Sequence, residues 1–135
     1  MAIDDDGPHL QSWEPYVRQI AELMGLSHWT VRVIDRPSGD DHADVDRING
    51  RYLAIIQFGS AFLRDTPEGQ RDTVVHELLH CHLAMQDYVA WENLPDPLKP
   101  VFRKANEYAV DLMARAWSAL LPLPPVAPKR KRGNR

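Results

Sequence analysis

The sequence predicts an α+β domain on the basis of three observations. A stretch with helical spacing comes first, three short β-prone stretches follow it, and two long helical patterns come last. Strands that are grouped together, instead of alternating with helices, are typical of the α+β class. The expected architecture is an N-terminal helix, a small three-stranded sheet with a hairpin, and two long helices.

The first helix is expected within residues 12–26, "SWEPYVRQIAELMGL", because its apolar residues recur at helical spacing. Ser12 is expected to cap this helix, and Pro15 falls in its first turn, where a missing N–H does no harm. Gly25 is the expected end of the helix.

Three strands are expected next. "TVRVID" (30–35) alternates and is rich in β-branched residues, as strands are. "ADVDRI" (43–48) and "RYLAIIQF" (51–58) flank Asn49-Gly50, a dipeptide typical of a tight hairpin turn. The second arm of this hairpin is the more apolar and is therefore expected to be the more buried.

Two long helices are expected to complete the domain. Thr66-Pro67 has the cap-and-proline signature of a helix start, and this helix is expected to run to about Ala90. The segment 91–97, "WENLPDP", is expected to be a connector because its two prolines prevent a helix from continuing. The last helix is expected to run from the Asp-Pro pair of this connector to Leu121.

The composition is that of a globular protein with its own core. The chain has 135 residues, of which 44% are hydrophobic and 26% charged. One domain is expected over residues 1–121. The proline-rich and then basic segment 122–135 cannot pack a core and is expected to be a disordered tail.

The single cysteine, Cys81, allows no internal disulfide, so a reducing compartment is expected. The acidic start of the chain lacks the apolar run of a signal peptide. No stretch approaches the roughly 20 apolar residues that a membrane span needs. A cytoplasmic protein with no membrane segment is therefore expected.

The charge is unevenly distributed. The last seven residues, "KRKRGNR" (129–135), hold five of the 16 basic residues, so 11 basic residues face 19 acidic ones in the rest of the chain. An acidic body is a poor electrostatic partner for a phosphate backbone. Nucleic-acid binding is therefore expected only through this tail, if the protein binds nucleic acid at all.

The segment "TVVHELLHCHLAMQ" (73–86) carries the clearest functional signal. On a helix, His76 and His80 lie on one face with Cβ atoms about 5–6 Å apart, so both imidazoles can reach one metal ion. Glu77 projects about 100° around the helix from His76, where it can polarise a metal-bound water. The alternative is a buried helix whose two histidines have ordinary hydrogen-bond partners.

The last helix offers a third ligand. Ten residues separate His80 from Ala90, and ten separate Pro97 from Glu107, so an antiparallel return brings Glu107 level with His80. The same count brings Asp111 level with His76. One carboxylate is expected to bind the metal, with Glu107 favoured, and the other to accept the spare N–H of His76. The alternative is a solvated polar face on this helix.

Other candidate ligands are excluded by their positions. His82 points about 160° away from His80 on the helical wheel, and Cys81 is expected to be a small buried apolar residue. Asp87 lies about 10 Å along the helix from His80. Glu92 and Asp96 fall in or beside the connector and are also too far.

"HELLH" (76–80) followed by "EYAVD" (107–111) resembles the zincin metallopeptidases of the gluzincin type. "RDTVVHELLH" and "GLSHWTVRV" are also similar to small phage-encoded and ImmA/IrrE-like metallopeptidases, although the acid here follows "KAN". The resemblance covers roughly residues 16–121 and implies a minimal zincin-like domain. It implies that His76, His80 and Glu107 bind Zn²⁺, that Glu77 is the catalytic base, and that Asp111 supports a ligand.

The leading hypothesis is therefore a zinc metallopeptidase that acts on a peptide or protein substrate. By analogy with such folds, part of segment 51–58 is expected to pair with extended substrate, although its apolar side chains are expected to be core. Candidate donors to a transition-state oxyanion are Tyr108, Tyr88, His42 and Arg51.

Two alternatives to this hypothesis remain open. The protein could be a non-proteolytic zinc-binding module that acts through a partner protein, or a nucleic-acid accessory protein that acts through its tail. Iron(II) is the alternative metal, because two histidines and a carboxylate also suit that ion. The oligomeric state is left open.

Overall fold

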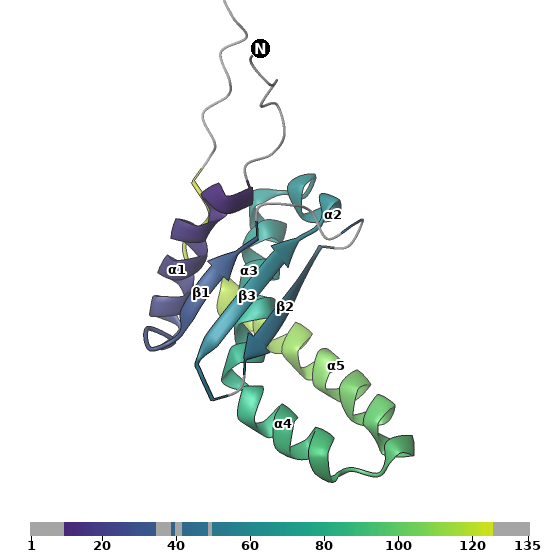
Figure 1. Cartoon of the computed structure of the whole chain (residues 1–135). Coiled ribbons are helices and arrows are strands. Elements are labelled where there is room, and N and C mark those ends of the chain that lie inside the picture. The colour runs from purple at the N-terminus through teal and green to yellow at the C-terminus, as the bar shows by residue number, and fades with distance from the viewer. Residues whose placement is uncertain (1–9, 35–38, 40–41, 49, 126–135) are drawn as a thin grey trace, which may run out of the picture.

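The computed structural model describes residues 10–34, 39, 42–48 and 50–125. These residues form an α+β fold with five α-helices and one three-stranded sheet (Figure 1), so the predicted fold class is confirmed. The elements in chain order are η1 (Leu10–Trp13), α1 (Glu14–Leu23), β1 (Thr30–Val33), β2 (Ala43–Ile48), β3 (Leu53–Phe58), α2 (Ser60–Leu63), α3 (Pro67–His82), α4 (Ala84–Asn93), η2 (Asp96–Leu98) and α5 (Lys99–Ser118).

The sheet has the strand order β1-β3-β2, with β1 parallel and β2 antiparallel to the central strand. Along β3 the burial alternates, and Ala54, Ile56 and Phe58 are fully buried. This face of the sheet packs against the helices, with α3 lying behind the sheet in Figure 1. A single buried face explains why β1 alternates between polar and apolar residues, whereas Leu53 and Ile55 make the other face of β3 largely apolar.

The hairpin between β2 and β3 is confirmed, but its connection is longer than the predicted two residues. Ile48 pairs with Leu53, so β3 begins two residues later than expected. Asn49 lies outside the described residues. Gly50 and Tyr52 both have a positive φ, of 82° and 49°, and the chain reverses through these left-handed residues.

The first helix begins differently from the expectation. Ser12 lies inside η1 and does not cap α1, because a 3₁₀ turn precedes the helix. The predicted end is confirmed, since Gly25 has a φ of 79°. The Leu26 N–H reaches back to the Ala21 carbonyl (2.8 Å), the bond of a Schellman motif.

The predicted helix from Thr66 to about Ala90 is broken in two. Thr66 caps it as expected, but α3 ends at His82 and α4 begins at Ala84. The cause lies elsewhere in the chain: the Arg47 side chain donates from Nη1 to the His80 carbonyl (2.7 Å). In a continuous helix that carbonyl would accept the Ala84 N–H, so the arginine competes with the helical bond. In Figure 1, α4 and α5 then project away from the sheet as a pair.

None of the described helices has the length and apolarity needed to cross a membrane. Two contacts of segment 122–125 with the domain lie past the residue at which the sequence predicted that the domain ends. The Tyr16 hydroxyl donates to the Pro122 carbonyl (2.7 Å), and Pro124 is buried. Residues 126–135, which include the basic tail, lie outside the described residues.

Replacing Tyr16 by Phe is expected to lower the free energy of unfolding by about 0.5–1.5 kcal/mol, because it removes this hydrogen bond and leaves the ring in place. Chemical denaturation of both proteins measures the difference. Tyr108→Phe is the control, because Tyr108 is 68% exposed. Equal losses for both variants would contradict a stabilising role for the Tyr16 bond.

Candidate metal centre

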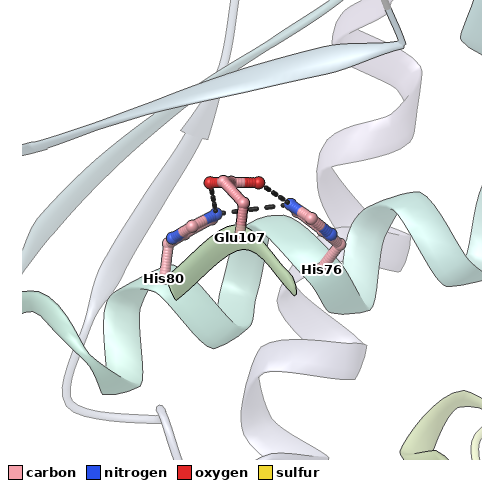
Figure 2. Close-up of side chains that lie close together, drawn as sticks. All are labelled: His76, His80 and Glu107. Carbon is pink, nitrogen blue, oxygen red and sulfur yellow. Dashed lines mark hydrogen bonds and ion pairs between the residues drawn. The ribbon is translucent and has the colours of Figure 1, made fainter. Parts of the chain in front are cut away.

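Two histidines of α3 and one glutamate of α5 converge on a single point (Figure 2). The His76 Nε2 atom lies 3.1 Å from Oε2 of Glu107, and the His80 Nε2 atom lies 2.9 Å from Oε1 of the same carboxylate. The two imidazole Nε2 atoms are 3.3 Å apart. The structure thus brings together the three residues that the sequence predicted as ligands.

The spacing of these donor atoms suits a small divalent cation. Two nitrogens that each lie about 2.0–2.1 Å from an ion, at a tetrahedral angle, are about 3.3–3.4 Å apart. The imidazole nitrogens match this separation. Burial lowers the pKa of His80, which favours the neutral imidazole that binds metals. The group of two imidazoles and one carboxylate could therefore hold a metal ion.

Asp111 lies where the sequence predicted it, beside the first histidine. Its Oδ1 atom is 2.8 Å from Nδ1 of His76. When the ring proton of His76 is on Nδ1, it is donated to this carboxylate and the lone pair of Nε2 is left for a metal ion. The contact with Asp111 also orients the ring of His76.

The packing of α5 explains why both carboxylates reach the site. Val110 and Ala114 are buried in the core, against which α3 also packs, and they fix the rotation of α5 about its axis. Glu107 and Asp111 are four residues apart and so share the neighbouring face. Both remain open to solvent, with side chains 48% and 56% exposed.

Glu77 is buried beside the ligands. Only 7% of the residue is exposed, and it lines the same hollow as His76, His80 and Glu107. Burial raises the pKa of Glu77 to about 8, with smaller contributions from the negative charges of Glu107 and Asp44. A cation held by the three ligands would favour the ionised carboxylate. Glu77 is thus placed to exchange a proton next to the metal position.

The residues that were excluded as ligands lie elsewhere. The His82 Nε2 atom bonds to the Met24 carbonyl (2.7 Å). Cys81 is 3% exposed, and burial raises the pKa of its thiol to about 12, so it is the inert buried residue that was expected. Asp87 accepts hydrogen bonds from Arg47 and Asn106. Glu92 and Asp96 are not in the His76–His80–Glu107 group.

A line of hollows crosses the site. The central one, of about 300 Å³, lies between the ligands and the inner face of β2. A second, of about 420 Å³, opens beside His76, and a third, of about 320 Å³, opens beside His80. His42 lines the second hollow and Tyr88 the third, whereas Tyr108 and Arg51 line none of the three. Of the four candidate oxyanion donors, two therefore border the site.

Arg47 was not predicted as a site residue. It lines the central hollow and the hollow beside His80, and it bonds to both His80 and Asp87. The alternation of "ADVDRI" could have revealed it, because residues 43, 45 and 47 share one face of the strand. A charged residue on the face that packs against a helix needs a partner and is a candidate for a role at a site.

The prediction that part of segment 51–58 forms the substrate-pairing edge is wrong. β3 is the central strand and pairs on both sides, so neither of its edges is open. Its side chains are core only in part, since Ile56 is fully buried while Leu53 and Ile55 are half-buried. The edge strands of the sheet are β1 and β2, and β2 is the one that borders the ligands. Apart from β3, no described strand pairs with β2.

The pairing of β2 with β3 shows which main-chain groups of β2 point away from the sheet. The Gly59 N–H donates to the His42 carbonyl (2.9 Å), which lies on the β3 side of the strand. Because main-chain groups alternate along an antiparallel ladder, those of Ala43, Val45 and Arg47 point away from β3. The same three residues line the central hollow, so an open strand edge borders the metal ligands.

Replacing Asp111 by Asn is expected to weaken metal binding by about 10–100-fold, because the bond that orients His76 loses its charge. Competition with a chelator of known affinity measures the change. Asp96→Asn is the control, since the side chain of Asp96 is 92% exposed and distant from the site. Unchanged affinity in Asp111→Asn would show that the contact does not support the ligand.

Among the described residues, His76, His80 and Glu107 form the group that could hold a metal ion. Comparison with protein-family models, with curated proteins and with solved structures finds no match to this chain.

Proposed function

We propose that the protein is a zinc-dependent metallopeptidase of the HExxH type, similar to the small zincin-like enzymes. One observation carries the proposal: His76, His80 and Glu107 converge on one point while the buried carboxylate of Glu77 lies beside them. Two histidines and a glutamate, with an open fourth position, are a ligand set of catalytic zinc sites.

The residues of the chain divide the chemistry between them. His76, His80 and Glu107 would hold a zinc ion, which would supply a Lewis acid for the peptide carbonyl and for a water molecule. Glu77 takes the proton of the attacking water and passes it to the departing amine nitrogen, as the C–N bond breaks. Asp111 keeps His76 oriented throughout, because its carboxylate holds the Nδ1–H.

The open edge of β2 supports an extended peptide as the substrate. Main-chain groups of Ala43, Val45 and Arg47 point outward beside the central hollow. A peptide that adds to this edge as a further strand satisfies those groups and places its own carbonyls near the ligands. This arrangement favours hydrolysis of unfolded or locally extended protein segments.

Metal analysis together with a cleavage assay tests the proposal. Protein that is purified without added metal is expected to contain about one zinc ion per chain, measured by elemental analysis. It is expected to cleave an unfolded protein, to stop after treatment with a chelator, and to recover when zinc is restored. Iron in place of zinc would refute the metal assignment, and no cleavage by the zinc-loaded protein would refute the enzymatic one.

A second candidate function is a zinc-binding module that is not proteolytic and that recognises a partner protein. The exposure of the carboxylates at the site favours it, since the side chains of Glu107 and Asp111 are about half exposed. In this case the metal ties α3 to α5 and stabilises a surface. Bound zinc without hydrolysis of any peptide distinguishes this function from the first.

A further inference from the structure

The hollow beside His80 has an aromatic lining. It lies between α4 and α5, has a volume of about 320 Å³, and opens next to His80 and Glu107. Tyr88 and Trp91 contribute from α4, and Phe102 contributes from α5. A volume of this size is at the lower end of small-molecule sites and can take one large side chain.

The charged groups of this hollow already have partners. Asp87 accepts hydrogen bonds from Arg47 Nη1 (2.5 Å) and from Asn106 Nδ2 (3.1 Å). The Arg103 guanidinium carbon lies 4.7 Å from the centre of the Trp91 ring, in a cation–π contact. A basic side chain entering the hollow would therefore find the Asp87 carboxylate already paired. An uncharged aromatic side chain would find rings to pack against.

The hollow on the other side of the ligands is different. It lies beside His76, and its lining includes the polar side chains of Asp65, Asp72 and Arg115. No aromatic ring other than those of His42 and His76 lines it. The two ends of the site therefore differ in chemistry, and only the end beside His80 offers large aromatic rings against which an aromatic side chain of the substrate could pack.

The direction of β2 indicates which part of a bound peptide would lie at each end of the site. The strand runs from Ala43, beside the polar hollow, to Arg47, beside the aromatic hollow. Antiparallel pairs are more frequent and slightly more stable than parallel ones. A peptide that pairs antiparallel with β2 runs in the opposite direction. Its residues before the cleaved bond then lie at the Arg47 end.

We propose that the aromatic hollow formed by Tyr88, Trp91 and Phe102 binds a large aromatic side chain of the substrate, on the amino side of the bond that is cleaved. The inference rests on the proposed peptidase function and defines the class of peptide that the site selects. The contacts that carry it are the aromatic lining, the paired state of Asp87, and the shared border with His80.

Cleavage of a peptide mixture, followed by mass spectrometry of the products, tests this inference. Cut sites are expected to carry Phe, Tyr or Trp immediately before or two residues before the broken bond. For a peptide pair that differs only in Phe or Ala at that position, kcat/KM is expected to favour Phe by about 10–100-fold. Trp91→Ala and Tyr88→Ala are each expected to reduce this ratio to a few-fold, without changing zinc content.

Tyr108→Ala is the matched control, because Tyr108 is an exposed tyrosine of α5 that lines none of the three hollows. It is expected to keep the full preference. A readout without turnover uses the zinc-loaded Glu77→Gln protein, in which the dissociation constants of the Phe and Ala peptides should differ by a similar factor. Trp91→Ala in that background should remove the difference.

The inference is overturned if the aromatic residue lies on the carboxyl side of the cut, or if both hollow variants keep the wild-type ratio. Either outcome leaves the peptidase proposal intact. If the zinc-loaded protein cleaves no peptide, the peptidase proposal fails instead, and the binding ratio in the Glu77→Gln background still decides whether the hollow takes an aromatic side chain.

Discussion

Glu77→Gln is expected to lower kcat/KM for peptide hydrolysis by about 10²–10⁴-fold while zinc content stays unchanged. The amide has nearly the same shape as the carboxylate but cannot take a proton from water. Glu77 is buried beside the ligands and is not itself one of them, so the metal position should be undisturbed. Activity on an unfolded protein and elemental analysis of the same sample measure the two effects.

Glu68→Gln is the control for this substitution. Glu68 lies in the first turn of the same helix, α3, and is exposed to solvent. It is expected to have wild-type activity and zinc content. Equal activity in Glu77→Gln and the wild type would rule out Glu77 as the base, even if zinc is present and peptides are cleaved.

Glu107→Ala is expected to abolish tight metal binding and the stability that depends on it. The carboxylate contacts both imidazoles, at 3.1 and 2.9 Å, and it is the only ligand that α5 contributes. In the wild type, free zinc at 100 times its dissociation constant is expected to raise the free energy of unfolding by about 2.7 kcal/mol. In Glu107→Ala the same zinc concentration should have almost no effect on thermal unfolding.

Glu92→Ala provides the matched control, because Glu92 is an exposed glutamate of α4 outside the ligand group. Its melting temperature is expected to rise with zinc and fall with a chelator, as in the wild type. A zinc-dependent stabilisation that survives in Glu107→Ala would show that the metal is held by other residues.

The positions of the candidate site residues follow from two simple counts along the sequence. Two histidines four residues apart need only a helix to share a face, and counting ten residues on each side of the connector placed Glu107 level with His80. The contacts of Glu107 with both histidines and of Asp111 with His76 agree with that count. The first inference depends on local geometry, which a sequence specifies directly. The second counted along one continuous helix, whereas the chain is divided there between α3 and α4.

The features that were missed depend on residues far apart in the chain. The break at Leu83 follows from a contact between Arg47 and the His80 carbonyl, which the helix's own residues do not encode. The order of strands, in which β3 is central, is likewise set by a parallel pairing across a long connection. The cap expected at Ser12 failed because a 3₁₀ turn extends the helical chain upstream.

The bend between α3 and α4 has a consequence for how selectivity could change in evolution. The guanidinium that interrupts the helix belongs to the strand along which a peptide would lie, and it also anchors Asp87 on the wall of the aromatic hollow. In the proposed function, the placement of the substrate main chain and the choice of its side chain would therefore both depend on Arg47. Mutations that change the preference for a substrate side chain without moving the protein backbone should therefore lie away from Arg47, at the far end of the α4–α5 pair.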